Sequence, residues 1–257
     1  MNYFVSCIYA DIEKLQKIVE DLELKENDTL WILGDLLDGD SEHPDNNVKI
    51  LDYVMYNKNI KVVLGDHEYF QNMRYLSMDN EDAYNAWVTY LSNMDISGKP
   101  FVDYIESEMN KDDQDSYFGS YLLSLELSEI VQIGDRYFYL VHCAPCPFPR
   151  SESLLTEWQM NVCTNDPKLD TPFWNVIRTD PIVYPFSKNQ KPISQQNCFV
   201  ISGQYPPDEA AKSVGMASNN SGIFYYNKTL CIGRRTPDDP LPVLGIDAAG
   251  FFVKGVY

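Results

Sequence analysis

Acidic and histidine side chains follow three predicted strands, each at the point where the strand ends. They are Asp35 and Asp38 in Gly-Asp-Leu-Leu-Asp, Asp66 and His67 in Gly-Asp-His-Glu, and His142 after the run YFYLV. Carboxylates and imidazoles gathered at one place can hold a divalent cation, and an Asp beside a His can orient that ring as a general acid. The pattern therefore predicts a site for metal or acid–base chemistry.

Strands and helices alternate in the first part of the chain that carries these residues. Apolar runs of strand length and segments with helical apolar spacing succeed one another as a strand at 3–8, a helix at 11–22, a strand at 29–33, a helix at 48–55 and a strand at 60–64. This order predicts an α/β fold whose parallel sheet has right-handed crossovers and a site at the carboxyl ends of its strands.

The segment at about 69–127 has helical spacing and is strongly acidic, so we predict an inserted helical cap. Its acidic cluster at 103–115 is either a solvated face or a site for a divalent cation or a basic partner. Both interpretations remain open from the sequence.

The remainder of the chain predicts a second sheet that completes a sandwich. A hairpin with its turn at Gly134-Asp135 joins strands at 129–133 and 136–142, and residues 145–195 are predicted as loops with a short helix near 151–160. Further short strands are predicted at 198–202, 222–226, 229–233, 244–247 and 251–257.

The composition excludes several classes of protein. The chain has 257 residues, 44% of them hydrophobic, and its 38 acidic against 20 basic residues give a net charge of -18. Such a charge opposes generic nucleic-acid and membrane-surface binding. Because no apolar run is long enough for a membrane helix and no signal peptide is evident, we expect a cytoplasmic protein with reduced thiols at its six cysteines.

The order of these motifs resembles the calcineurin-like metallophosphoesterases. The resemblance is greatest to the branch that contains serine/threonine phosphoprotein phosphatases and symmetrical bis(5'-nucleosyl)-tetraphosphatases. That family has Asp-x-His-Gly, Gly-Asp-x-x-Asp-Arg-Gly, Gly-Asn-His-Glu, a later His-Ala-Gly or His-Gly-Gly, and a final Gly-His-Thr. The corresponding stretches here are SCIYA at 6–10, GDLLDG at 34–39, GDHE at 65–68, HCA at 142–144 and GQY at 203–205.

The resemblance implies a fold and a site. The fold is a double β-sheet sandwich flanked by helices, formed by residues 1–257 as a single domain with the helical insertion at about 69–127. The family site holds two metal ions bridged by one aspartate, and the attacking hydroxide is activated there. Asp35 matches the bridging aspartate, Asp66 the asparagine ligand and His142 a second-metal histidine, while His67 matches the general acid and Asp38 its orienting carboxylate.

Four departures from the family pattern alter this site. Cys7 and Tyr9 replace the Asp and His that hold the first metal, and Gln204 replaces a second-metal His. Gly39 stands where the family has a phosphate-binding arginine. A dinuclear centre is therefore doubtful.

One divalent metal, Mn, Fe or Zn, is still compatible with Asp35, Asp66, His142 and the amide oxygen of Gln204. We expect weak catalysis or none, in which case the protein is a pseudophosphatase-like module that binds a phosphorylated small molecule, a nucleotide or a protein partner. The alternative is a mononuclear metal-dependent phosphatase or nucleotide pyrophosphate hydrolase with His67 as acid.

A cysteine-based site is a second alternative. Cys143 and Cys146 form a Cys-x-x-Cys after His142, and Cys7 lies close to them if the first strand runs beside the strand that ends at His142. The group would be a soft-metal or redox site. Ordinary free thiols are the other interpretation.

Two arginines occupy regions where relatives carry functional groups, Arg178 after a Trp and Arg234 after Gly233. We predict that both are surface residues.

Overall fold

A computed structural model describes residues 1–39, 42–82, 84, 85, 87, 88, 99–143, 198–204, 206–216, 223–226, 228–234, 236 and 238–257. Its strands are β1 (Asn2–Val5), β2 (Thr29–Leu33), β3 (Ile60–Val63), β4 (Ser128–Ile133), β5 (Arg136–Val141), β6 (Cys198–Ser202), β7 (Phe224–Tyr226), β8 (Thr229–Cys231), β9 (Pro242–Ile246) and β10 (Phe251–Val256). Its helices are α1 (Ile12–Leu22), α2 (Asn46–Tyr56), α3 (Asp66–Ser77), α5 (Lys99–Glu108), α6 (Lys111–Gln114), the π-helix η1 (Asp115–Leu122) and α9 (Pro207–Ser213).

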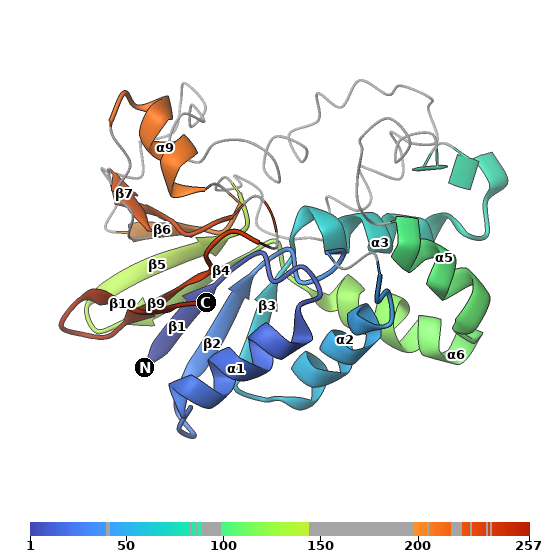
Figure 1. Ribbon diagram of the computed structural model, residues 1–257, viewed down its shortest axis with the longest axis horizontal. Helices are drawn as coiled ribbons and strands as arrows, with labels where there is room; N and C mark the ends of the chain where they lie inside the picture. Colours follow the sequence, from blue (N-terminus) through green and yellow to red (C-terminus); the bar gives the residue numbers. More distant parts are fainter. Residues whose placement is uncertain are drawn as a thin grey trace.

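Two mixed five-stranded sheets form the centre of the fold (Figure 1). The first has the order β10-β9-β1-β2-β3, in which β1, β2 and β3 are parallel and β9 and β10 are antiparallel additions. The second has the order β4-β5-β6-β8-β7, with parallel pairing of β5, β6 and β8. The predicted α/β double-sheet sandwich is confirmed.

Successive side chains along the strands of the first sheet point to opposite faces, and both faces are buried. On β2, Leu30 and Ile32 face the helices, whereas Trp31 and Leu33 face the second sheet. A strand buried on both faces is continuously apolar, as TLWIL is. Leu140 of the second sheet packs into the layer between the sheets.

Helices cover the outer side of each sheet. α1 and α2 pack on the first sheet, with Leu15 and Ile18 of α1 and Ile50 of α2 fully buried in that core. Ala210 and Ala211 of α9 pack on the second sheet. The sequence analysis misses α9, although Pro at its first turn followed by two acidic residues is a helix-start signal.

The acidic segment predicted at about 69–127 contains α3, α5, α6 and η1, although α3 begins earlier than predicted, at Asp66. Several of its acidic side chains have local partners. Asp103 pairs with Lys99 at 2.7 Å, and Asp115 accepts a hydrogen bond from the Tyr75 hydroxyl at 2.7 Å. These contacts favour the interpretation as a solvated face.

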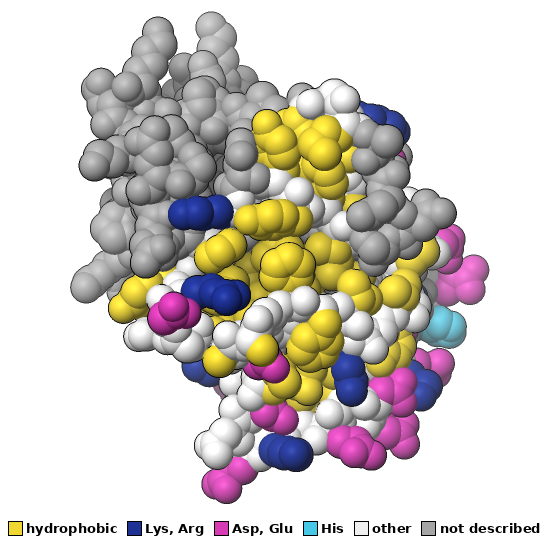
Figure 2. Space-filling model, turned by 90° about the vertical axis from the view of Figure 1, so that its left-hand side faces the viewer, with side chains coloured by type: hydrophobic (Ala, Val, Ile, Leu, Met, Phe, Trp, Pro, Cys, Tyr) yellow, Lys and Arg dark blue, Asp and Glu magenta, His cyan; other side chains and the backbone are white. Residues whose placement is uncertain are grey.

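Figure 2 shows apolar side chains gathered on one face of the molecule, on the side where the β9–β10 hairpin lies in Figure 1. Exposed apolar residues on β10 are Phe251, Phe252, Val253 and Val256. Among the described residues, no helix is both long and apolar enough to span a bilayer. The predicted short helix near 151–160 lies outside the described residues.

Candidate functional site

Asp35, Asp66 and His142 converge where β2, β3 and β5 end. Their ligand atoms all lie within 4.8 Å of one another, and all three side chains are buried. The His142 Nε2 atom is 3.2 Å from Asp35 Oδ1 and 3.1 Å from Asp66 Oδ1. The structure thus brings together three of the four predicted metal ligands.

The backbone fixes the orientation of the His142 ring. Its Nδ1 donates to the Leu33 carbonyl oxygen at 2.7 Å, so Nε2 faces the two carboxylates. Burial lowers the pKa of His142, but Asp35 and Asp66 outweigh burial and raise that pKa well above its usual value. A side chain at Gly34 would meet His142 Nδ1 at 2.4 Å, which explains the glycine before Asp35.

Two buried side-chain oxygens receive no hydrogen bond in the described structure: Asp35 Oδ1, within the trio, and Oε1 of Gln204, a residue whose backbone is bonded to His142. Asp35 Oδ1 is near His142 Nε2, yet that nitrogen makes its hydrogen bond to Asp66 Oδ1. The Gln204 backbone N–H donates to the His142 carbonyl oxygen at 2.5 Å, which places the fourth predicted ligand residue beside His142. Orphaned acceptor oxygens are what a bound cation requires, so these residues fit a divalent metal.

A second pair, His67 and Asp38, lies beside the carboxylates. His67 Nδ1 is 3.3 Å from Asp38 Oδ2, and Gln71 Nε2 is 3.4 Å from the same carboxylate. Burial lowers the pKa of His67, but Asp35, Asp38 and Asp66 together raise it to about 10. The ring is therefore protonated and oriented as a general acid would be.

Glu68 holds the loop that carries Asp35, a role that the sequence analysis does not assign. Its carboxylate accepts from the backbone N–H groups of Asp35, Leu36, Leu37 and Gly65 at 2.8–3.0 Å. Burial and the nearby Asp35 raise the pKa of Glu68 to about 7. The sequence signal was available, because Glu68 is the last residue of the Gly-Asp-His-Glu stretch.

The opposite side of Asp35 is formed by the loop after β1. Cys7 Sγ is 3.7 Å from Asp35 Oδ2 and 3.4 Å from the Gly203 carbonyl oxygen. β1 pairs with β2, so Cys7 reaches Asp35 from the neighbouring strand of the same sheet. The strand that ends at His142, β5, belongs to the other sheet, so β1 does not run beside it. The residues with left-handed backbone, apart from glycine, include Cys7, Tyr9, Ala10, Asp35 and Asp38, and their concentration here is typical of functional loops.

Arg234 is buried, which corrects the prediction of a surface arginine. Only 2% of it is exposed, and its guanidinium donates to the carbonyl oxygens of Cys7 at 2.6 Å, Ile8 at 3.1 Å and Asp239 at 3.2 Å. It also lies 5.5 Å from the centroid of the Tyr9 ring. Sequence reasoning misses this because all three acceptors are backbone atoms, and two of them, the Cys7 and Ile8 carbonyls, are more than two hundred residues away in the chain.

Tyr9 and Gly39 explain why the phosphate-binding arginine has no counterpart. A side chain at Gly39 would meet the Tyr9 carbonyl oxygen at 2.1 Å and Tyr9 Cβ at 2.2 Å, so the loop admits no side chain there. The Tyr9 hydroxyl donates to the Arg234 carbonyl oxygen at 3.3 Å, and its ring packs edge-on against His67 at 5.6 Å.

The structure describes only part of the predicted cysteine-based soft-metal or redox site. Cys7, Cys143 and Cys231 are buried and are not joined in disulfides, while Cys146 and Arg178 lie outside the described residues. Burial and the Asp35 carboxylate raise the pKa of Cys7 to about 11. In the absence of a cation, its thiol is protonated.

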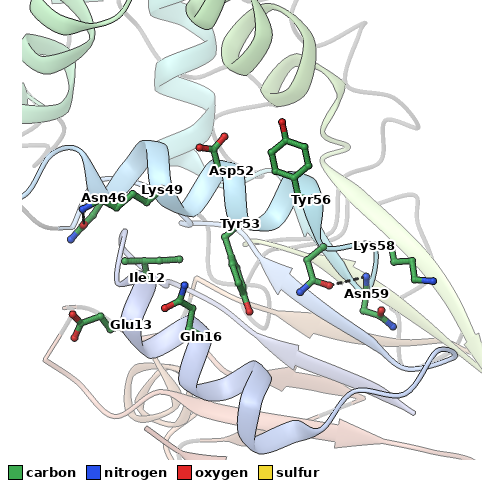
Figure 3. Close-up of a pocket in the computed structure, with 11 residues that line it drawn as sticks. Ile12, Glu13, Gln16, Asn46, Lys49, Asp52, Tyr53, Tyr56, Lys58 and Asn59 are labelled. Atoms are coloured by element: carbon green, nitrogen blue, oxygen red, sulfur yellow. Dashed lines mark hydrogen bonds between the residues drawn. The ribbon is translucent and has the colours of Figure 1, made fainter.

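A cavity of about 950 Å³ lies elsewhere, between α1 and α2 (Figure 3). Ile12 and Gln16 of α1 line it together with Tyr53 and Lys49 of α2. None of the candidate ligands or acid–base residues lines this cavity.

Comparisons with known proteins give a family and a fold. A family model described as calcineurin-like phosphoesterase matches residues 3–143. A solved structure assigned as a candidate diadenosine tetraphosphatase has a TM-score of 0.51 at 13% identity, covering 98% of this chain and 91% of that one. A Saccharomyces cerevisiae protein serine/threonine phosphatase with similarity to human phosphatase PP5 has a TM-score of 0.51 at 12% identity, covering 98% and 78%. No curated protein matches the sequence.

Proposed function

The chain belongs to the calcineurin-like phosphoesterase family, and from this premise we propose that it binds one divalent cation and uses it to bind and slowly hydrolyse phosphoric esters or anhydrides. The family is metal-dependent, and Asp35, Asp66 and His142 are a trio able to hold a metal. The observation that carries the proposal is the pair of orphaned buried oxygens, Asp35 Oδ1 and Gln204 Oε1.

The cation ligands in this proposal are Asp35, Asp66, His142 and Gln204, and the metal is Mn, Fe or Zn. A divalent cation bound there supplies a Lewis acid for a phosphoryl oxygen. The Leu33 carbonyl holds the His142 ring so that Nε2 faces the cation position. An oriented imidazole of this kind is a typical metal ligand in proteins.

His67 is the proton donor in this proposal. The charged ring lies against Asp38, and 15% of its side chain remains exposed, so a leaving-group oxygen has access to it. Protonating that oxygen removes the cost of expelling an alkoxide. Asp38 is a positioning residue because it contacts the ring and not the reacting atoms.

Slow turnover follows from what surrounds these residues. Gly39 offers no cationic side chain, and the Arg234 guanidinium donates to the backbone carbonyls of Cys7 and Ile8. Loss of one preorganised charge contact costs about 10²-fold in rate. We therefore expect a rate well below that of an intact dinuclear site.

The test is metal content by mass spectrometry on protein purified without chelator, followed by turnover of a chromogenic phosphate ester with Mn²⁺. We expect about one bound metal, with turnover reduced by about 10²-fold or more in both Asp35→Asn and His67→Ala. Only Asp35→Asn should lose the metal. Asp103→Asn, an exposed carboxylate, is the matched control and should behave as the wild type.

A non-catalytic binding module is the second candidate, and the geometry of Tyr9 favours it. The hydroxyl of Tyr9 donates to the Arg234 carbonyl oxygen, so the side chain that replaces a histidine ligand is already engaged in a hydrogen bond. In this case the protein holds a phosphorylated small molecule, a nucleotide or a protein partner without turnover. Metal-dependent binding of a nucleotide with no turnover sensitive to His67→Ala would favour this candidate.

A further inference from the structure

We propose that Asn47 and Gln71 are positioning residues, which together hold Asp38 so that its carboxylate orients the His67 ring. The inference rests on the proposed function, in which His67 is the proton donor. It adds two neutral amides, one from α2 and one from α3, to the residues on which that proton donation depends.

The first argument concerns the backbone of Asp38. This residue has a φ of 63°, a conformation that a residue other than glycine keeps only where the surrounding structure holds it. Its N–H donates to Asn47 Oδ1 at 2.8 Å, and Asn47 Nδ2 in turn donates to the Pro44 carbonyl oxygen at 3.0 Å. Because Asn47 is only 1% exposed, water does not compete for its amide. Asn47 therefore fixes the backbone from which the Asp38 carboxylate projects.

The second argument concerns the carboxylate of Asp38. The last torsion angle of an aspartate side chain is broadly distributed, so contacts from outside must set the plane of its carboxylate. Gln71 Nε2 lies 3.4 Å from Asp38 Oδ1 and 3.4 Å from Asp38 Oδ2. His67 and Gln71 are four residues apart on α3, so both reach this carboxylate from the same face of the helix. The Gln71 amide thus restrains the carboxylate that contacts His67.

The third argument is that Gln71 uses its polar group on Asp38 alone. Gln71 is 2% exposed, and its Oε1 atom receives no hydrogen bond in the described structure. Among the described residues, the Asp38 carboxylate is the one hydrogen-bond partner of this side chain. A buried amide that is only half satisfied is unfavourable, and an apolar side chain would fill the same space without that cost. The contribution of the amide therefore lies in its contact with Asp38.

The consequence for the proposed reaction is a dependence on the leaving group. His67 Nδ1 is 3.3 Å from Asp38 Oδ2, so the direction of the ring follows the placement of that carboxylate. A general acid must lie within hydrogen-bond reach of the oxygen that it protonates. A basic leaving group needs this proton, whereas a weakly basic one departs as an anion. A misdirected ring should therefore slow only the first kind of substrate.

The experiment compares kcat for phenyl phosphate, which has the more basic leaving group, with kcat for 2,4-dinitrophenyl phosphate, using the full chain with Mn²⁺. We expect Gln71→Met and Asn47→Leu to lower kcat for phenyl phosphate by about tenfold or more and kcat for the dinitrophenyl ester by less than about threefold. KM and Mn²⁺ affinity should stay the same, because neither residue belongs to the group of converging ligand atoms. Asn47→Asp keeps an acceptor oxygen and should restore most of the rate with phenyl phosphate.

Two other buried amides provide matched controls. The Gln114 amide donates to the Met109 carbonyl oxygen at 3.1 Å, and the Asn72 amide donates to the Leu122 carbonyl oxygen at 3.0 Å. Gln114→Met and Asn72→Leu remove the same chemical groups from positions that do not contact Asp38. In these variants the ratio of the two rates should equal that of the wild type.

A second measurement requires no turnover. The chain has three histidines, so the ¹⁵N resonance of His67 Nδ1 can be assigned by its absence in His67→Ala. We expect this resonance to move in Gln71→Met and Asn47→Leu and to stay in place in both controls.

An unmoved resonance, or rates that fall equally for both esters, would overturn the inference and leave the proposed function intact. If the wild type hydrolyses neither ester, the proposed function fails, and the resonance alone decides whether the two amides hold the Asp38–His67 pair. Asn47→Ala replaces Asn47→Leu if the leucine variant does not fold, and the same results are expected from it.

Discussion

The two sides of Asp35 are built in different ways. On one side, His142, which follows β5, approaches its Oδ1 atom, and Asp66, the first residue of α3, completes the group of ligand atoms. On the other side, Cys7 belongs to a loop with left-handed backbone that Arg234 holds through its carbonyl oxygens. The first side is organised by side chains that can bind a cation, and the second by hydrogen bonds to the main chain.

This difference shows that the metal-ligating side chains of a site can be replaced while the backbone that carries them keeps its conformation. Arg234 supplies a fixed cation to the loop after β1, and its bonds to Cys7 and Ile8 keep that loop in place whether or not a metal binds. On the side of Asp66 and His142, the positive charge is carried by the imidazole rings of His142 and His67, whose pKa values the carboxylates raise. Variants on the two sides should therefore differ in how they affect stability and Mn²⁺ binding.

The largest expected effect is on the metal side, in Glu68→Ala. The substitution leaves four buried backbone N–H groups without their acceptor, and each such group costs about 1–3 kcal/mol. We expect the free energy of unfolding to fall by about 4 kcal/mol or more, measured by urea denaturation. Glu68→Gln keeps one acceptor oxygen and should lose about half as much, whereas the exposed Glu108→Ala should change little. An unchanged free energy of unfolding in Glu68→Ala would mean that the loop bearing Asp35 does not depend on this carboxylate.

Arg234→Met tests the other side and is expected to have the next largest effect. Hydrogen bonds to a charged group contribute about 1.5–3 kcal/mol each, and the variant removes three while filling a similar volume. We expect a loss of about 3 kcal/mol in urea denaturation, below the sum of the three contributions because an apolar side chain of similar volume removes the cost of burying a charge, with Mn²⁺ affinity retained. The free energy of unfolding of Arg234→Lys should lie between those of the wild type and Arg234→Met, because lysine keeps the charge but has fewer directed donors. Loss of Mn²⁺ binding in a folded Arg234→Met protein would contradict the independence of the two sides.

The sequence predicts the regular elements well where the apolar pattern is unambiguous. The strands at 29–33 and 198–202 have the predicted bounds, and the helix predicted at 48–55 lies within Asn46–Tyr56. The first strand is shorter than predicted because residues after Val5 turn into the left-handed loop. Helix α9 is missed because only seven residues form it, too few for an apolar period to be visible.

Within the site, the sequence predicts the residues that act through their side chains at strand ends. Asp35, Asp66 and His142 come together as expected, because the carboxyl ends of β2, β3 and β5 meet at one edge. The role of Arg234 is not predictable in this way. Its acceptors are carbonyl oxygens, which every residue possesses, so no residue type marks them.

A smaller effect is expected for Asp38→Asn, which keeps the shape of the side chain but removes its charge from His67. Under the proposed function, turnover of the phosphate ester should fall by about 10- to 100-fold, as typically seen when a residue that orients a functional group is changed. Mn²⁺ affinity should stay the same, because Asp38 is not one of the three residues whose ligand atoms converge. A combined loss of Mn²⁺ binding would instead make Asp38 part of the metal site.

The smallest effect is expected at Asp11, where the loop of Cys7 passes into α1. The Asp11 carboxylate caps this helix by accepting from the Lys14 backbone N–H at 2.9 Å, so Asp11→Ala should cost about 1 kcal/mol in urea denaturation. Asp11→Ser keeps a capping oxygen and should recover most of the loss.

The double variant of Asp11→Ala and Arg234→Met tests whether the Asp11 cap and the Arg234 guanidinium stabilise the same loop. They hold neighbouring residues of one segment, since Arg234 binds the Cys7 and Ile8 carbonyls just before the cap. We therefore expect the double variant to lose less than the sum of the two single losses, with a coupling of about 0.5 kcal/mol or more. Strict additivity would show that α1 and the Cys7 loop are held independently, and that Arg234 alone organises the sulfur side of Asp35.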